Sequence, residues 1–244
     1  MSRRARGLLF LPIAGAALAG LIAACTGLPD AGSGASAYGH FAASQMVDKR
    51  GTTDVVSAVT FDLRAFDTLG EEFILFAAAA ACALVLRVLA GRDVDARREQ
   101  HAPAIAFAGM HALAAWLVAP TIVLAAYITS HGHITPGGGF QGGVIAATAS
   151  LLVFAAGHGA IARSVAALEV TEALGAGAFA LLGVGGLVFA TAAFANFLGP
   201  GTPGDLLSGG TIPLLNVAVG IEVAAAFTLI FVELLEQALV RDAG

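Results

Sequence analysis

Six long apolar runs constrain the fold of this chain more than any other feature of its sequence. They lie at residues 7–26, 69–90, 105–129, 141–162, 172–197 and 212–234. Each is close to the roughly 20 residues that an α-helix needs to cross about 30 Å of hydrocarbon. A charged fraction of 12% and a mean hydropathy of +0.86 fit a membrane protein better than a soluble domain. The sequence therefore predicts an all-α, polytopic integral membrane protein with about six transmembrane helices in the lipid bilayer.

The positions of Lys and Arg predict how the chain is oriented. These residues favour the cytoplasmic side of a membrane protein. If both termini share one side, nine of the twelve fall on that side, and the other three are Lys49, Arg50 and Arg64. We therefore expect a multi-pass protein of the cell membrane with both termini in the cytoplasm. The net charge of −5 gives no reason to expect nucleic acid as a partner. Cys25 and Cys82 suggest neither a disulfide framework nor a metal site.

The first apolar run allows two interpretations. Arg3, Arg4 and Arg6 precede it, and Leu21–Cys25 looks like a lipoprotein cleavage site, so the run could be a signal that is removed. The alternative is a retained helix. After it, residues 28–67 form a more polar, outward-facing connection, whose last part favours an amphipathic helix on the membrane surface over a strand.

The segment between the third and fourth runs, Tyr127 to Gly143, is the least ordinary part of the sequence. From Pro136 onward it holds five glycines and a proline within eight residues. Proline lacks a backbone donor and glycine costs about 1 kcal/mol per helix position, so the chain must turn here. A simple turn needs less glycine, so this density predicts backbone packed closely against another backbone or a ligand. His131, His133 and Gln141 would then be polar groups held at a fixed place.

Glu222 is the acid that the sequence places deepest in the membrane. It follows Ile212, near the start of the last run, by ten residues, which at about 1.5 Å per residue puts its carboxyl roughly 15 Å deep. An acid there costs a few kcal/mol unless it is protonated, paired or hydrated. Two readings follow. Glu222 handles protons or cations, or it makes a structural hydrogen bond to a neighbouring helix or subunit.

Glu71 stands at the start of the second run and also has two readings. Thr68 followed by Glu71 has the spacing of a capping box, in which each side chain satisfies a backbone donor at a helix start. The functional alternative is an acid at the outer mouth of a proton or cation path.

The other charged groups near the runs have structural explanations. Glu169 and Glu172 stand one turn apart at the start of the fifth run, where acids favour the helix dipole. Glu233 and Glu236 stand at the inner end of the last run and are predicted to be interfacial, with Arg87 at a comparable depth.

Enzymatic chemistry is not indicated. His111 and His158 lie near the cytoplasmic ends of their runs and are predicted to be packing or interfacial residues. The glycine run Gly137–Gly143 lacks the preceding strand and the Lys-Ser/Thr pair of a phosphate-binding loop. The sequence contains no metal-ligand cluster and no nucleophile with its base, so we expect no catalytic residue, no metal and no cofactor.

The glycine-rich segment carries a likeness to a known family. It resembles the signature of the B subunit, MnhB or MrpB, of Mrp-type multisubunit Na+/H+ antiporters. The residues that carry it are Tyr127, His131, His133, Pro136, Gly137, Gly138, Gly139, Phe140, Gln141, Gly142 and Gly143. The later run Gly209–Asn216 resembles the start of that family's last helix, and together the two cover roughly residues 105–240.

The first half is similar to a different part of the same complexes. Asp54–Val56 and Phe61–Glu71 resemble the C-terminal end of the large A-type subunit, which is a small separate protein in related membrane-bound hydrogenase complexes. In that family a span and a Leu-Pro-Asp-like start precede the motif, as here, which favours the retained first helix. The family's Asn-Val-Val-Asn is Asp-Val-Val-Ser at this place, so a role of those asparagines does not carry over. We expect two fused modules, residues 1–100 with two transmembrane helices and residues 101–244 with four.

The resemblance implies a function. The chain would be one membrane subunit of a cation (Na+)/proton antiporter complex, with A, C, D, E, F and G type subunits as partners and Na+ and H+ as transported ions. Glu71 and Glu222 would be the ion-path candidates, and the glycine turn would shape the outward face. Two alternatives stay open: a subunit of a related membrane-bound hydrogenase or redox complex, and a purely structural membrane subunit.

Overall fold

The computed structural model describes residues 3–27, 37–90, 108–155 and 165–242, and within these ranges every regular element is a helix. The chain forms two compact units, residues 1–41 and 42–244. The first unit contains α1 (Arg3–Thr26), and α2 (Ala37–Arg50) begins in it. The predicted module boundary near residue 100 and His158 lie outside the described residues.

Four helices of the described chain are long and apolar enough to cross a membrane. They are α4 (Ala65–Ala90), α6 (Ala108–Ser130), α8 (Val165–Phe189) and α9 (Ile212–Asp242). Two shorter apolar stretches, Ala14–Thr26 in α1 and Gly139–Phe154 in α7 (Gly139–Ala155), add to them. The predicted class, an all-α polytopic membrane protein, is confirmed.

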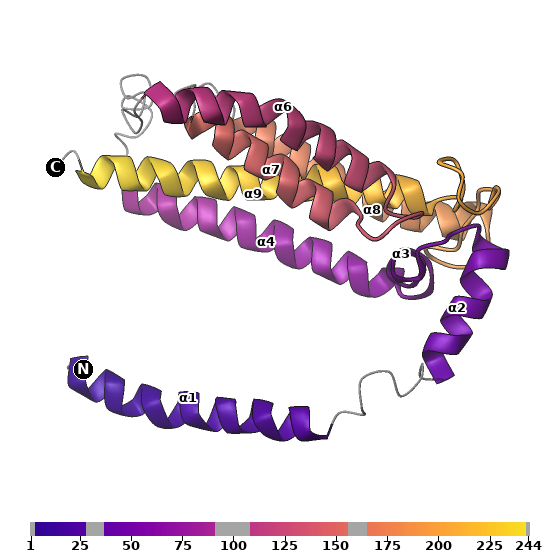
Figure 1. The fold of residues 1–244 in the computed structure, drawn as a ribbon, viewed down its shortest axis with the longest axis horizontal. Helices are drawn as coiled ribbons and strands as arrows, with labels where there is room; N and C mark the ends of the chain where they lie inside the picture. Colours follow the sequence, from indigo (N-terminus) through magenta and orange to yellow (C-terminus); the bar gives the residue numbers. More distant parts are fainter. Residues whose placement is uncertain (1–2, 28–36, 91–107, 156–164, 243–244) are drawn as a thin grey trace. The chain divides into compact units, whose positions relative to one another are not determined.

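Helix α9 forms the centre of the second unit. It packs against α4, α7 and α8, and α6 packs on the outside of α7 (Figure 1). Of the most apolar 18 residues of α9, 67% are buried, whereas the corresponding share in α6 is 11%. Helix α9 is therefore the element around which the others assemble. The core beside it includes Phe61, Phe179, Phe194, Leu215 and Val219.

The fifth predicted span, residues 172–197, is displaced from the helix that the structure shows. Helix α8 covers residues 165–189, after which the chain folds back on itself. The Phe194 amide donates to the Gly183 carbonyl at 3.0 Å, and Phe194 has a left-handed φ of 59°. A Cβ at Gly186 would lie 2.6 Å from the Ala192 carbonyl oxygen, so glycine permits this close return. The folded-back segment is as apolar as a helix, which is why apolar length alone misplaced the span.

The predicted capping box at Thr68 and Glu71 is wrong. Helix α4 begins three residues earlier, at Ala65, and the Thr68 hydroxyl donates instead to the Thr60 carbonyl at 2.7 Å. The cause is a helical turn just before α4, made of α3 (Val55–Ala58) and the π-helical η1 (Val59–Leu63), whose carbonyls reach Thr68. The helical reading of this part of the connection is thereby confirmed.

Candidate functional site

Three buried acids from three helices form the candidate site. Glu222 of α9 is 0% exposed, Glu72 of α4 is 1% exposed and Glu172 of α8 is 2% exposed. Within the described chain both carboxyl oxygens of Glu72 and Glu222, and one of Glu172, make no hydrogen bond. Glu222 is thus buried between helices, and it is accompanied by two acids that the sequence analysis did not select.

Glu72 and Glu222 face each other across the α4–α9 contact. Their carboxyl groups interact directly, although they do not meet the geometry of a conventional hydrogen bond. Glu172 interacts electrostatically with Glu222 and with Glu169. Among the described residues no three His, Cys, Asp or Glu side chains converge as metal ligands. The acids therefore form a series of neighbouring groups rather than a coordination cage.

Helix periodicity explains why these acids point inward. On α4 the buried positions Ala65, Thr68, Glu72, Ala79 and Ala83 follow the three- and four-residue spacing of one helix face. Glu71, one residue before Glu72, is rotated by about 100° and is exposed.

Glycine brings α8 into direct contact with the backbone beside Glu222. On α8 the buried face contains Glu172, Gly175, Ala176 and Phe179. A Cβ at Gly175 would lie 2.6 Å from the Glu222 backbone nitrogen. Glu172 is one turn before Gly175, so the same close approach brings its carboxyl toward Glu222.

The prediction that Glu169 and Glu172 stand at a helix start, where acids favour the helix dipole, does not describe their environment. Helix α8 begins at Val165, so Glu172 lies in its third turn and is buried. Glu169 instead accepts a hydrogen bond from Arg87 Nη2 at 2.7 Å, and Arg87 Nε donates to Glu233 at 2.7 Å. Glu233, predicted to be interfacial, has a side chain only 3% exposed. Arg87 thus joins α4, α8 and α9 at the end of the bundle opposite the glycine turn.

The glycine turn is fixed to α9 by Asn216. Its side-chain oxygen accepts a hydrogen bond from the Gly139 amide at 2.9 Å. Its side-chain nitrogen donates to Ser57 Oγ at 3.0 Å and to the Ile212 carbonyl at 3.2 Å. Asn216 is 0% exposed, so these three bonds form in the protein interior. It joins the glycine turn to the helical turn that precedes α4.

The glycines of the turn pack as their density predicted. A Cβ at Gly132 would lie 2.5 Å from Gly138 Cα, and a Cβ at Gly143 would lie 2.6 Å from Val223 Cβ. Gly137 and Gly138 have φ values of 152° and 134°, which side-chain-bearing residues rarely adopt. The prediction of backbone against backbone is confirmed.

The remaining motif residues have separate roles. Pro136 is exposed, and Gly142 packs against Thr129 of α6. Phe140 packs against the core beside α9. Gln141 is exposed at the start of α7.

The two histidines of the motif differ. His131 stacks on Tyr127 with ring centroids 4.1 Å apart and completes the end of α6. His133 is 0% exposed, and within the described chain neither of its ring nitrogens makes a hydrogen bond. Burial lowers the pKa of His133, the nearby backbone carbonyls of Asp205 and Leu206 oppose that change, and the neighbouring His131 adds to it. His133 is therefore held neutral near pH 7.

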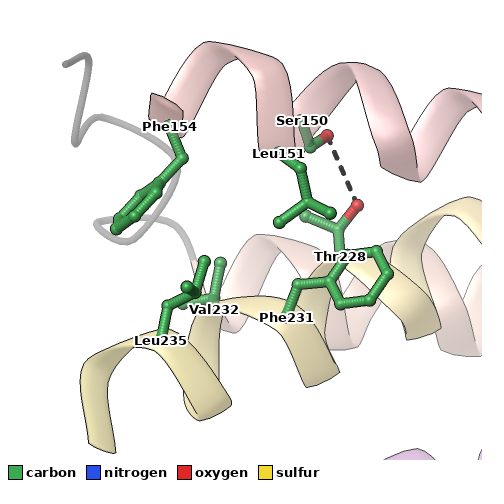
Figure 2. Close-up of a pocket in the computed structure, with 7 residues that line it drawn as sticks. All are labelled: Ser150, Leu151, Phe154, Thr228, Phe231, Val232 and Leu235. Carbon is green, nitrogen blue, oxygen red and sulfur yellow. Dashed lines mark hydrogen bonds between the residues drawn. The ribbon is translucent and has the colours of Figure 1, made fainter. Parts of the chain in front are cut away.

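A shallow depression between α7 and α9 shows ordinary helix packing (Figure 2). It is lined by Ser150, Leu151, Phe154, Thr228, Phe231, Val232 and Leu235. The Thr228 hydroxyl donates to Ser150 Oγ at 3.3 Å, and the other lining side chains are apolar. No group in this lining titrates, so the depression offers nothing to an ion.

Comparisons with known proteins bear on the second unit and on the whole chain. Residues 109–229 match a family described as a domain related to the MnhB subunit of Na+/H+ antiporter. An uncharacterized protein of Methanocaldococcus jannaschii, MJ1307, is 35% identical over 193 residues, which cover 71% of this chain and 73% of that protein. A probable A/B subunit of a K+/H+ antiporter from Rhizobium meliloti is 32% identical over 125 residues, 44% of this chain but only 12% of that protein.

A solved structure is similar over nearly the full length. A chain of the membrane-bound sulfane sulfur reductase, an archaeal respiratory membrane complex, superimposes with a TM-score of 0.72 and 28% sequence identity. The match covers 96% of this chain and 99% of that chain. Because both halves of the chain are included, the likeness extends beyond the part related to MnhB.

Proposed function

The chain belongs to the family related to the MnhB subunit of Na+/H+ antiporters, and from that premise we propose that it carries part of the ion path of its complex. It is a multi-pass membrane subunit of a cation/proton antiporter-like complex. The proposed path uses the buried acids Glu72, Glu222 and Glu172. Glu71 lies at its outer mouth.

The facing pair Glu72 and Glu222 is the observation that carries the proposal. An ionised carboxylate in the bilayer interior costs at least a few kcal/mol. Two carboxyl groups that face each other in a low-dielectric site avoid that cost and their mutual repulsion by holding a proton between them. A shared proton of this kind can be released when a cation or another proton approaches, which is the exchange that an antiporter requires.

The acids continue toward the Arg87 end of the bundle. Glu222 interacts with Glu172, Glu172 with Glu169, and Glu169 with Arg87. A cation or proton that leaves Glu222 would therefore meet acids at successive steps rather than an apolar barrier. With both termini cytoplasmic, as the Lys and Arg distribution predicts, this end faces the cytoplasm and the glycine turn faces outward.

The wider assignment follows from the same proposal. The chain would act without catalytic chemistry of its own, beside A, C, D, E, F and G type subunits, in a complex that exchanges Na+ for H+. It would consist of an A-tail module, residues 1–100, fused to a B module, residues 101–244. The Asp54 amide, which donates to the His133 carbonyl at 3.2 Å, and Ser57, which accepts from Asn216, support a fixed contact between the two modules.

Transport by the intact complex tests the ion path. In inverted vesicles with equal assembled amounts, we expect Glu222→Gln and Glu72→Gln each to lower cation-dependent proton transport at least about ten-fold. Because the two acids act as a unit, the double variant should be no slower than the slower single one. Thr228→Val, which removes a hydroxyl from α9 away from the acids, is the control. Wild-type rates in both single variants would refute the proposal.

A redox complex is the second candidate, and the likeness to the sulfane sulfur reductase chain favours it. That match covers 99% of the other chain, whereas the antiporter relative is matched over 12% of its length. In this case electron transfer in partner subunits would drive the same ion path. Mass spectrometry of the complex purified through this chain separates the two, because iron–sulfur or nickel–iron proteins would be present only in the redox complex.

A purely structural subunit is the remaining alternative. It predicts that the complex falls apart without this chain but transports normally when Glu72 and Glu222 are both replaced by glutamine. The same vesicle assay therefore distinguishes it from an ion path.

A further inference from the structure

A small pocket lies where the glycine turn meets the turn before α4, and its lining mixes polar groups with the apolar side chains of Val56, Phe61 and Phe140. Its volume is about 80 Å³, and its lining includes Ser57, Thr60, Glu71, Gly137, Gly138 and Gln141. One water needs roughly 10 to 15 Å³ of such space, so the pocket has room for an ion together with several waters. These residues are far apart in the sequence and come from both proposed modules.

The lining offers oxygen atoms. Glu71 supplies a carboxylate, and the Gln141 side-chain oxygen folds back over Gly138, 3.4 Å from where a Cβ would stand. The Thr60 hydroxyl donates its hydrogen to the carbonyls of Val56 and Ser57, at 3.0 Å and 3.1 Å, so the oxygen lone pairs remain available. Carboxylate, amide and hydroxyl oxygens are the ligands that hard cations prefer.

The charges around this pocket decide whether it favours a cation or an anion. The start of α7 would favour an anion, since backbone amides point outward at a helix N-terminus. The first of them, at Gly139, is already bonded to Asn216. Among the lining residues of the described chain none is basic, and Glu71 is acidic. The lining therefore attracts a cation and repels an anion.

The number of carboxylates indicates the class of cation. Divalent ions such as Ca2+ are generally held by several carboxylates, whereas this lining has one. A single negative charge with neutral oxygens matches a monovalent ion that keeps part of its water shell.

We propose that this pocket, formed by Glu71, Gln141, Thr60 and the glycine turn, binds a monovalent alkali cation at the mouth of the path. The inference rests on the proposed function, since a mouth needs a path behind it. Glu72 is next to Glu71 on α4, about 100° around the helix and on the side that faces Glu222, so the helix connects the pocket to the buried pair. The glycine turn thereby acquires a role beyond packing: it forms one wall of the cation site.

Equilibrium binding of radioactive 22Na+ to the purified whole complex tests the site, because both membrane faces are then accessible. Ionic strength is kept constant with choline, since screening changes charge effects. We expect Glu71→Gln to raise the half-saturating Na+ concentration of one site at least about five-fold. This follows from the loss of one unit charge at ~4 Å even at the dielectric constant of water. Gln141→Met, which keeps the shape but removes the oxygen, should act in the same direction.

Asp67→Asn is the matched control. Asp67 is an exposed acid one turn before Glu71 on α4, pairs with Arg64 and does not line the pocket. Its replacement should leave Na+ binding unchanged. The Glu222→Gln complex should keep the pocket site even if its transport is lost, so failure of the path and failure of the pocket give different results. If both Glu71→Gln and Gln141→Met bound Na+, and K+ in competition with it, as tightly as the wild type does, the proposal would be overturned.

Discussion

Replacing Asn216 by alanine should loosen the glycine turn from α9. The variant removes the acceptor of the Gly139 amide and the donor to Ser57 and Ile212. A hydrogen bond contributes about 0.5 to 1.5 kcal/mol net in proteins, and bonds between transmembrane helices average about 0.6 kcal/mol. Three such bonds give roughly 2 to 4 kcal/mol. The buried Gly139 amide, left without its acceptor, places the expected loss in the upper part of that range.

Denaturant titration of the detergent-solubilised protein measures this loss. Thr228→Val is the comparison, because the Thr228 hydroxyl makes one 3.3 Å hydrogen bond to Ser150 and its loss should cost less than about 1 kcal/mol. Hydrogen exchange at the Gly139 amide should also accelerate in Asn216→Ala, since this amide loses its acceptor. A double-mutant cycle with Ser57→Ala isolates the bond between the two proposed modules. Equal destabilisation by Asn216→Ala and Thr228→Val would refute the reasoning.

Three further outcomes follow from the structure. Gly175→Leu should lower the stability of the α8–α9 contact by about 1 to 3 kcal/mol through overpacking, measured by thermal unfolding, whereas Gly177→Leu should not, because a Cβ there meets nothing within 4 Å. Arg87→Gln should cost about 1 to 3 kcal/mol in the same measurement, since it removes the cation that two acids share, and Arg64→Gln in an exposed pair less than about 1 kcal/mol. Burial lowers the pKa of His133 in the folded chain. Neutral His133 therefore contributes its full stability above the unfolded pKa of about 6.5, and this contribution is lost as the pH falls from 6.5 toward the lower folded pKa. His133→Gln should flatten this acid limb of a plot of stability against pH.

Depth and composition allowed much of this architecture to be predicted. Apolar length located the long helices, because a span has to cover the hydrocarbon whatever its neighbours are. The same argument identified Glu222, since an acid ten residues into a span cannot reach water by its position alone. The glycine turn was recognisable because its density exceeds what a simple turn requires. Each of these features depends on the chain's own geometry.

Features that depend on the phase of a helix were missed. In a soluble protein, polar residues on the outer face would show which of Glu71 and Glu72 points inward. In a membrane helix both faces are apolar, so that signal is weak, and the exposed Glu71 was selected instead of its buried neighbour. Glu172 was missed because the fifth span was displaced by seven residues, which moved this acid to a helix start. Thr68 and Ala79 share the buried face with Glu72, but only the structure shows that burial.

The acids of the candidate site are divided between the two halves of the chain. Glu72 comes from the part that resembles an A-type tail, and Glu222 and Glu172 come from the part related to MnhB. Among the residues that the structure describes, the facing pair needs both parts, and the pocket beside the glycine turn is likewise lined from both. Hydrogen bonds from Asn216 to both turns fix their relative position on α9. The proposed shared proton requires two carboxyl groups at a constant separation, and the contacts that Asn216 makes with both turns help to hold that separation.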